Sequence, residues 1–142
     1  MSDFETIGGH EALQKIMDDF VGRVFDDVMI GFFFRNASRE RVAKMEALFA
    51  AKLLGAKDVH YTGKSIRDAH AKHPIMGGQF MRRQVILRQT LNDHGVSDEI
   101  IERWLAHNES LRSQVTGDRA GHCDEAAATR RMKLHTSSPQ SD

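Results

Sequence analysis

The most informative stretch of the chain is YTGKSIRDAHAKHPIMGGQF, residues 61–80, which predicts a short helix carrying one histidine, His70, just before a proline and glycine break. Ser65 heads an S-I-R-D sequence that suits a capped helix start. Pro74 and the glycine pair after it leave a helix of only about 6 to 8 residues, which is too short to be stable alone in water. Either the domain core or a ligand must therefore hold it in place.

The position of His70 suggests what that ligand is. Ile66 precedes His70 by four residues, so both side chains share one face of the short helix. An aliphatic residue one turn before an imidazole suits a haem site, in which the imidazole coordinates the iron and the aliphatic group packs the porphyrin. His70 and His73 also form H-x-x-H, which fits two solvated histidines or, with no Asp, Glu or Cys placed to complete a tetrahedral set, a less favoured transition-metal pair. Spacing alone leaves these interpretations open.

Length and charge restrict the class of protein. A chain of 142 residues has the size of one domain. Its 20 basic side chains balance 20 acidic ones, which disfavours binding to nucleic acid. No apolar run approaches the roughly 20 residues of a membrane span, and the N-terminus lacks the features of a signal peptide. Cys123 is the one cysteine, so no internal disulfide forms, in keeping with a cytoplasmic location.

Apolar residues recur at helical spacing on both sides of this stretch, and no segment alternates as a strand does. The pattern predicts an all-α domain of four substantial helices and one short one. The long helices are expected over roughly 10–27, from the cap Ser38 to Gly55, from Gly77 to about Asn92, and from Ser97 to about Val115. An irregular corner with three phenylalanines, residues 32–34, separates the first two, and a polar, mobile tail is expected over 117–142.

This order of features resembles the truncated haemoglobins, specifically their first group. The similar stretches, within about residues 6 to 115, are IGGHEALQKIMDDFVGRVF, the FFF corner, KMEALFAAKLLG, YTGKSIRDAH, and GQF with its trailing helix ending NDHGVSDE. The resemblance implies a truncated globin-like two-over-two helical sandwich over residues 1–116, followed by the tail. It also implies haem b as the cofactor and a diatomic gas, namely dioxygen, nitric oxide or carbon monoxide, as the ligand.

The resemblance assigns roles to residues that match the family's pattern. His70 corresponds to the proximal histidine that holds the iron. Phe33 or Phe34 corresponds to the corner phenylalanine that wedges against the porphyrin, and Lys44 to a basic residue that pairs with a haem propionate. Tyr61 begins the loop that leads to the proximal helix. The residues expected to pack the ring are Leu48, Ile66, Ile75, Phe80 and Ile86. The alternative for each is ordinary core packing or a solvated charge.

The chain departs from the family on the distal side, where the gas binds. Phe20 is followed by Val21, where the family usually has a tyrosine that donates a hydrogen bond to dioxygen. The next candidates to line the distal pocket are Arg41 and Met45, the latter at a position often occupied by glutamine. A donor stabilises a partly negative ligand by about 1.5–3 kcal/mol when charge assists the bond. An apolar pocket therefore releases dioxygen faster unless Arg41 swings in, whereas carbon monoxide depends on the donor less. Ligation of iron by the Met45 thioether is a less favoured alternative to packing.

The main functional hypothesis is therefore a haem-b globin that reversibly binds a diatomic gas, for dioxygen transport, storage or sensing. Turnover is also open, as nitric-oxide dioxygenation or a peroxidase-like activity with an electron-donor reductase. A monomer or weak homodimer is expected. The alternative is a haem-free helical module that binds a protein partner or a small apolar ligand, which leaves the placement of His70 unexplained.

Overall fold

The computed structural model describes residues 1–60, 65, 67, 70 and 75–116. All regular secondary structure in this part of the chain is helical. The elements are α1 (Asp3–Ile7), α2 (Gly9–Asp26), the 3₁₀ helix η1 (Gly31–Phe34), α3 (Arg39–Leu53), α5 (Gly77–Asp93), α6 (Asp98–Ser110) and α7 (Arg112–Thr116). No helix in the described ranges is long and apolar enough to cross a membrane.

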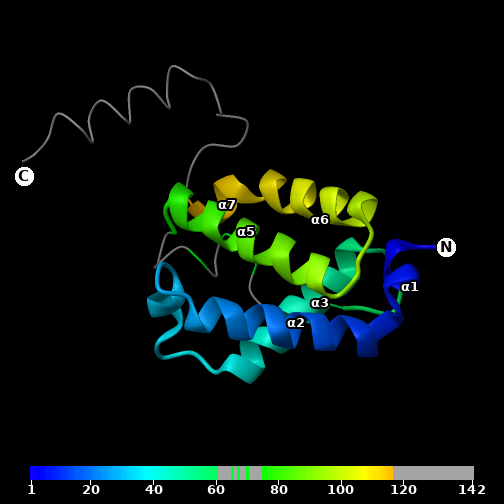
Figure 1. The fold of residues 1–142 in the computed structure, drawn as a ribbon, viewed down its shortest axis with the longest axis horizontal. Coiled ribbons are helices and arrows are strands. Elements are labelled where there is room, and N and C mark those ends of the chain that lie inside the picture. Colours follow the sequence, from blue (N-terminus) through cyan, green and yellow to red (C-terminus); the bar gives the residue numbers. More distant parts are fainter. Residues whose placement is uncertain (61–64, 66, 68–69, 71–74, 117–142) are drawn as a thin grey trace, which may run out of the picture.

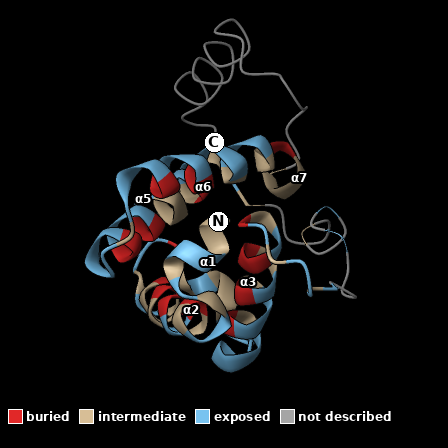
Figure 2. Cartoon of the chain, turned by 90° about the vertical axis from the view of Figure 1, so that its right-hand side faces the viewer, coloured by how far each residue is buried: buried red, intermediate tan, exposed pale blue. Residues whose placement is uncertain are grey.

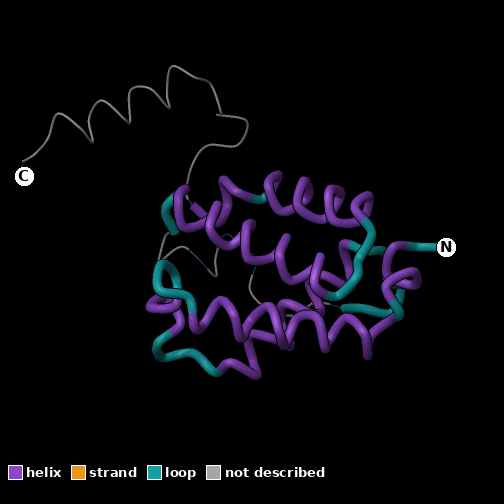
Figure 3. The backbone as a smooth tube through the Cα atoms, in the orientation of Figure 1, coloured by secondary structure: helices purple, strands orange, loops and turns teal. Residues whose placement is uncertain are grey.

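The helices form two layers (Figure 1). α2 packs on α3 in one layer, while α5 packs on α6 in the other, and α2 also contacts α5 so that the layers stack. Figure 3 shows that the turn joining α5 to α6 lies at the same end of the molecule as the N-terminus. The expected two-over-two helical sandwich is confirmed.

Four long helices follow the predicted ranges closely because their ends carry strong local signals. The Ser38 hydroxyl accepts a hydrogen bond from the backbone N–H of Arg41 (3.3 Å) and caps α3. Gly55 ends that segment with a φ of 105°, a conformation that favours glycine. The last predicted helix is broken into α6 and α7 at Leu111. The predicted short helix lies largely outside the described residues, although Arg67 and His70 are helical. The predicted tail, 117–142, also lies outside them.

Two elements differ from the expectation. The N-terminal helix α1 is additional, and a capping box between Ser2 and Glu5 starts it. The corner predicted to be irregular contains η1, one turn of 3₁₀ helix.

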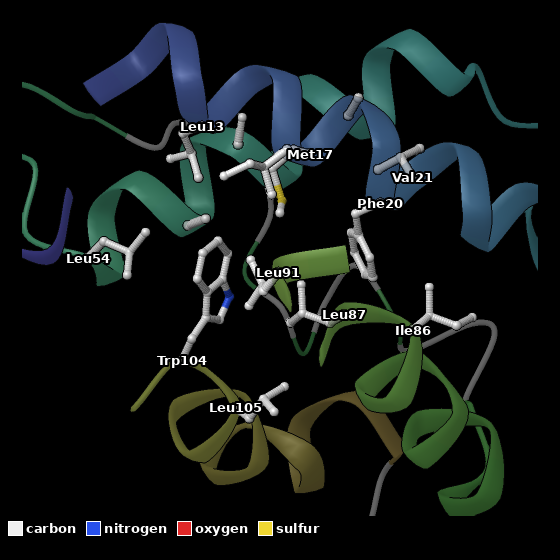
Figure 4. Packing of buried hydrophobic residues seen from close by; sticks show 14 of the residues in the cluster. Leu13, Met17, Phe20, Val21, Leu54, Ile86, Leu87, Leu91, Trp104 and Leu105 are labelled. Carbon is white, nitrogen blue, oxygen red and sulfur yellow. The ribbon is translucent and has the colours of Figure 1, made fainter. Parts of the chain in front are cut away.

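The core fills the space between the layers. α2 contributes six buried side chains at helical spacing, namely Leu13, Ile16, Met17, Phe20, Val21 and Val24. Leu87 and Leu91 of α5 face them, and Trp104 of α6 points toward the α2–α3 layer (Figure 4). Buried residues lie on the inward sides of the helices and exposed ones on the outward sides (Figure 2). Burial of this apolar area supplies the main stabilisation of the fold.

Asp27 fixes the end of α2 to the opposite layer. Its carboxylate is only 6% exposed and accepts two hydrogen bonds from the Arg82 guanidinium of α5 (2.7 and 3.0 Å). The same carboxylate accepts from the backbone N–H groups of Met29 (3.0 Å) and Ile30 (3.2 Å). The hydrogen bonds from Arg82 are the main reason that the pKa of Asp27 lies below its usual value. These bonds position η1 relative to α5.

Candidate functional site

An apolar cavity of about 510 Å³ lies among η1, α3, α5, α6 and α7. This volume falls within the range of about 300–1,000 Å³ that is usual for cofactor and small-molecule sites. The larger apolar side chains in its wall are Val24, Ile30, Phe33, Phe34, Val42, Met45, Phe49, Leu53, Ile75, Phe80, Trp104, Leu111 and Val115. Such a wall suits a large, flat and mostly apolar ligand.

His70 lies in the wall of this cavity and is half-buried. Among the described residues it is the only histidine that lines the cavity. The predicted neighbours Tyr61 and Ile66 lie outside the described residues. The imidazole of His70 therefore borders an apolar pocket, and its role as an iron ligand stays a prediction.

The phenylalanine corner forms one end of the cavity. Both Phe33 and Phe34 line it, and which of them wedges against the porphyrin stays a prediction. Phe34 stacks on Phe25 of α2, with ring centroids 5.0 Å apart. Gly31 permits this close packing, since a Cβ atom there would lie 2.5 Å from the backbone oxygen of Phe25. The turn thus holds two aromatic rings in the wall.

α3 forms a second side of the cavity. Arg41 and Met45 line it, as predicted for the distal pocket. Lys44 and Leu48 are exposed and do not line it. Cavity-lining residues of α3 recur at spacings of three and four, and positions 44 and 48 fall outside the arc that they cover. The roles that the resemblance assigns to Lys44 and Leu48 stay predictions.

Three other predicted residues lie behind the wall rather than in it. Phe20, Val21 and Ile86 belong to the hydrophobic core, and each is at most 3% exposed. The predicted packing residues Ile75 and Phe80 do line the cavity. Phe20 nevertheless contacts a residue of the site, because the guanidinium of Arg83 lies over its ring, 4.9 Å from the centroid.

Sequence reasoning missed a charged pair in the cavity wall. Arg83 of α5 donates from Nη2 to Oε1 of Glu46 on α3 at 2.8 Å, and both residues line the cavity. Arg83 follows Phe80 by three residues and precedes Leu87 by four, which places it on the inward face of α5. That spacing was the signal available in the sequence.

The residues present fit a haem group. Haem iron requires one axial nitrogen, and the porphyrin requires extended apolar walls. His70 would supply the nitrogen, in a wall that includes Phe33, Phe34 and Phe80. By contrast, no group of three or more His, Cys, Asp or Glu in the described parts of the chain is arranged to hold a metal ion. His73, the second residue of the predicted pair, lies outside those parts.

Comparison with known proteins identifies the family. The sequence model of the bacterial-like globins matches residues 2–117. The group 1 truncated haemoglobin of Tetrahymena thermophila is 34% identical over 114 residues, which cover 80% of this chain and 93% of that protein. That of Mycolicibacterium paratuberculosis is 28% identical over 120 residues, covering 84% and 88%.

Solved structures agree with this relationship. The truncated haemoglobin of Tetrahymena pyriformis in its Fe(III) form superposes with a TM-score of 0.75 at 27% identity, over 81% of this chain and 97% of that chain. The two-over-two haemoglobin of a Synechococcus species, with covalently attached haem, gives a TM-score of 0.76 at 24% identity, which supports the fold. The chain therefore belongs to the bacterial-like globin family, as a haem-binding two-over-two globin related to the group 1 truncated haemoglobins.

Proposed function

We propose that this globin binds haem b through a single proximal ligand, His70, and reversibly binds a diatomic gas, namely dioxygen, nitric oxide or carbon monoxide. The observation that carries the proposal is the position of His70 in the wall of an apolar cavity of about 510 Å³. When haem is bound, its ferrous iron supplies the site for the gas. The chain supplies the axial nitrogen and the shape of the pocket.

The aromatic wall keeps water away from that site. Phe33 and Phe34 reach the cavity from η1, Phe49 from α3 and Phe80 from α5, so aromatic rings approach it from several elements. A dry, low-dielectric pocket strengthens the electrostatic interactions of any polar group within it. The few polar groups in the wall therefore have a large influence on which ligand is held.

Two of the predicted distal residues offer dioxygen no hydrogen-bond donor. Val21, which stands where the family usually has tyrosine, is buried in the core and has no donor to offer. Met45 lines the cavity and offers a thioether, which is a weak acceptor only. Arg41 lines the cavity from an exposed position, so its guanidinium is one candidate that swings toward the ligand. Where no arginine donates to the ligand, we expect carbon monoxide to be bound more durably than dioxygen.

The absorption spectrum of the purified full chain after haem addition tests the proposal. We expect a red protein with a Soret band, a spectral change when carbon monoxide is added to the reduced form, and loss of both features in His70→Ala. His107→Ala is the matched control, because His107 is exposed on α6 and does not line the cavity. A chain that stays colourless, as a haem-free module would, or a His70→Ala variant with an unaltered spectrum contradicts the proposal.

Several finer expectations accompany this function and stay predictions of the sequence. They are turnover by nitric-oxide dioxygenation or peroxidase-like chemistry, an electron-donor reductase, a monomeric or weakly dimeric state, and a cytoplasmic location. Catalytic consumption of nitric oxide by the oxygenated protein, measured with an electrode, separates turnover from simple binding.

A further inference from the structure

Arg83 is a charged residue at a position where the fold would accept an apolar one. It lies on the inward face of α5, between the buried side chains of Phe80 and Leu87. Its side chain is 24% exposed and lines the cavity. A partly enclosed guanidinium is costly to desolvate, so its retention in the wall needs compensation from its neighbours.

Two neighbours hold this guanidinium in a defined position. Glu46 accepts a hydrogen bond from Nη2 at 2.8 Å, and the Phe20 ring lies 4.9 Å from the guanidinium carbon, in cation–π geometry. A guanidinium has five N–H donors, and the bond to Glu46 uses one of them. Arg83 is therefore both oriented and able to donate to a ligand in the cavity.

The neighbours also indicate the side of the cavity on which Arg83 acts. Phe20 and Met45, the residue before Glu46, are among the residues that the family resemblance places on the gas side. The described residues contribute two cationic groups, Arg41 and Arg83, and one carboxylate, Glu46, to the cavity wall. Because the two positive charges outnumber the one negative charge, the cavity wall favours ligands that carry negative charge.

We propose that Arg83 is the specificity-determining residue of this cavity, supplying the charged donor that Val21 lacks, so that the site prefers small inorganic anions and ligands with partial negative charge. Glu46 acts as a positioning residue that holds the guanidinium in place. This inference rests on the proposed function, because the ligand is taken to bind at haem in the same cavity. Arg83 instead of Arg41 is the main donor, since its place is fixed by two contacts.

Fluoride binding to the ferric haem-loaded protein tests the proposal, because fluoride is a small anion that depends strongly on hydrogen-bond donors. We expect Arg83→Met to weaken fluoride binding by about tenfold or more, as for loss of a charge-assisted hydrogen bond. Arg83→Lys keeps the charge and should restore much of the affinity. Glu46→Gln keeps an acceptor that positions the guanidinium but removes the counter-charge, so fluoride affinity should not fall and is expected to rise.

Arg88→Met is the matched control. Arg88 lies on the same helix and pairs with Glu102 of α6, but it is exposed and does not line the cavity. Its substitution should leave fluoride affinity unchanged. Urea unfolding of the haem-free variants reports the structural cost of each change separately. A merely structural ion pair predicts that Arg83→Met and Glu46→Gln weaken fluoride binding in the same direction.

The C–O stretching frequency of the ferrous carbon monoxide complex gives a second readout. A positive charge near the ligand oxygen draws electron density into the C–O antibonding orbital and lowers the frequency, so Arg83→Met should raise it.

If Arg83 pairs with a haem propionate instead, Arg83→Met speeds haem loss but alters neither fluoride affinity nor the C–O frequency, which overturns the proposal. A loss confined to Arg41→Met overturns it as well. A chain that takes up no haem contradicts the proposed function too, whereas a haem-loaded Arg83→Met with normal fluoride affinity contradicts this inference alone.

Discussion

Two adjacent aspartates at the end of α2 have very different environments. The Asp27 carboxylate is 6% exposed and accepts bonds from Arg82 and from two backbone N–H groups. The Asp26 carboxylate is 72% exposed and contacts Arg39 at 2.9 Å. Exposed ion pairs contribute little to stability, whereas an enclosed carboxylate with several donors contributes more. Asp27 is therefore a structural anchor, whereas Asp26 is a surface charge.

We expect Asp27→Asn to lower the free energy of unfolding by about 1–2 kcal/mol at neutral pH, because it weakens charge-assisted hydrogen bonds in an enclosed place. Asp26→Asn, the control, should change it by less than about 0.5 kcal/mol. Urea titrations of both variants measure the difference. Equal effects at the two positions would show that Asp27 is not an anchor.

The same residue predicts a dependence on pH. Hydrogen bonds from Arg82 are the first cause that lowers the pKa of Asp27 in the folded state. The unfolded state, with an Asp pKa of about 3.9, then binds more protons in acid than the folded state does. This contribution is present above about pH 3.9 and is lost as the pH falls through the lowered folded value. Unfolding curves of wild type and Asp27→Asn should converge below pH 4, and a constant difference would contradict this assignment.

At the scale of elements, the sequence predicted the long helices well and the cavity wall only in part. The ends of these helices were predictable without tertiary structure, because they depend on local backbone chemistry at Ser38, Gly55 and the glycine pair of residues 77–78. α1 was missed because five residues give too short a pattern. Arg83 was missed because arginine is usually exposed, although its spacing from Phe80 and Leu87 places it on the inward face of α5. The roles of Lys44 and Leu48 follow from the family resemblance, and both side chains are exposed on α3.

At the scale of elements, Gly31 also determines how the phenylalanine corner packs against α2. Its missing Cβ would lie 2.5 Å from the Phe25 backbone oxygen, so Gly31→Ala must displace η1. We expect a loss of about 1–3 kcal/mol in stability, as for other overpacked sites, together with weaker haem retention, because Phe33 and Phe34 move with η1. Haem transfer to an acceptor globin measures the retention.

Gly78→Ala is the control for that substitution. Gly78 lies near the start of α5, and a Cβ atom there meets nothing within 4 Å. The alanine should leave stability unchanged or raise it by up to about 1 kcal/mol through its helix propensity. If both alanine variants behave alike, close packing at Gly31 is not what sets the corner.

At the scale of the whole molecule, two helical layers form the fold, and elements of both line the cavity described above. The layers are joined through the core between α2 and α5 and by peripheral ion pairs such as Asp3 to Arg103, with bonds of 2.9 Å. Trp104, the one tryptophan of the chain, is 2% exposed, belongs to the core and also lines the cavity. The fluorescence of this buried tryptophan therefore reports on the same space that His70 lines.

Haem that enters this cavity should quench the fluorescence of Trp104, since the chromophore absorbs at the emission wavelength and lies within the same pocket. Titration of the haem-free protein should give near-complete quenching at one haem per chain. Unquenched emission at that ratio, while the Soret band develops, would place the haem elsewhere on the molecule.

The most direct test of the central claim is replacement of the axial ligand by its free equivalent. In His70→Gly, we expect the ferrous spectrum to lose the features of imidazole coordination, and millimolar imidazole to restore them together with a normal carbon monoxide complex. A His70→Gly variant whose spectrum equals that of the wild type, and which does not respond to imidazole, would contradict the assignment of His70 as the proximal ligand.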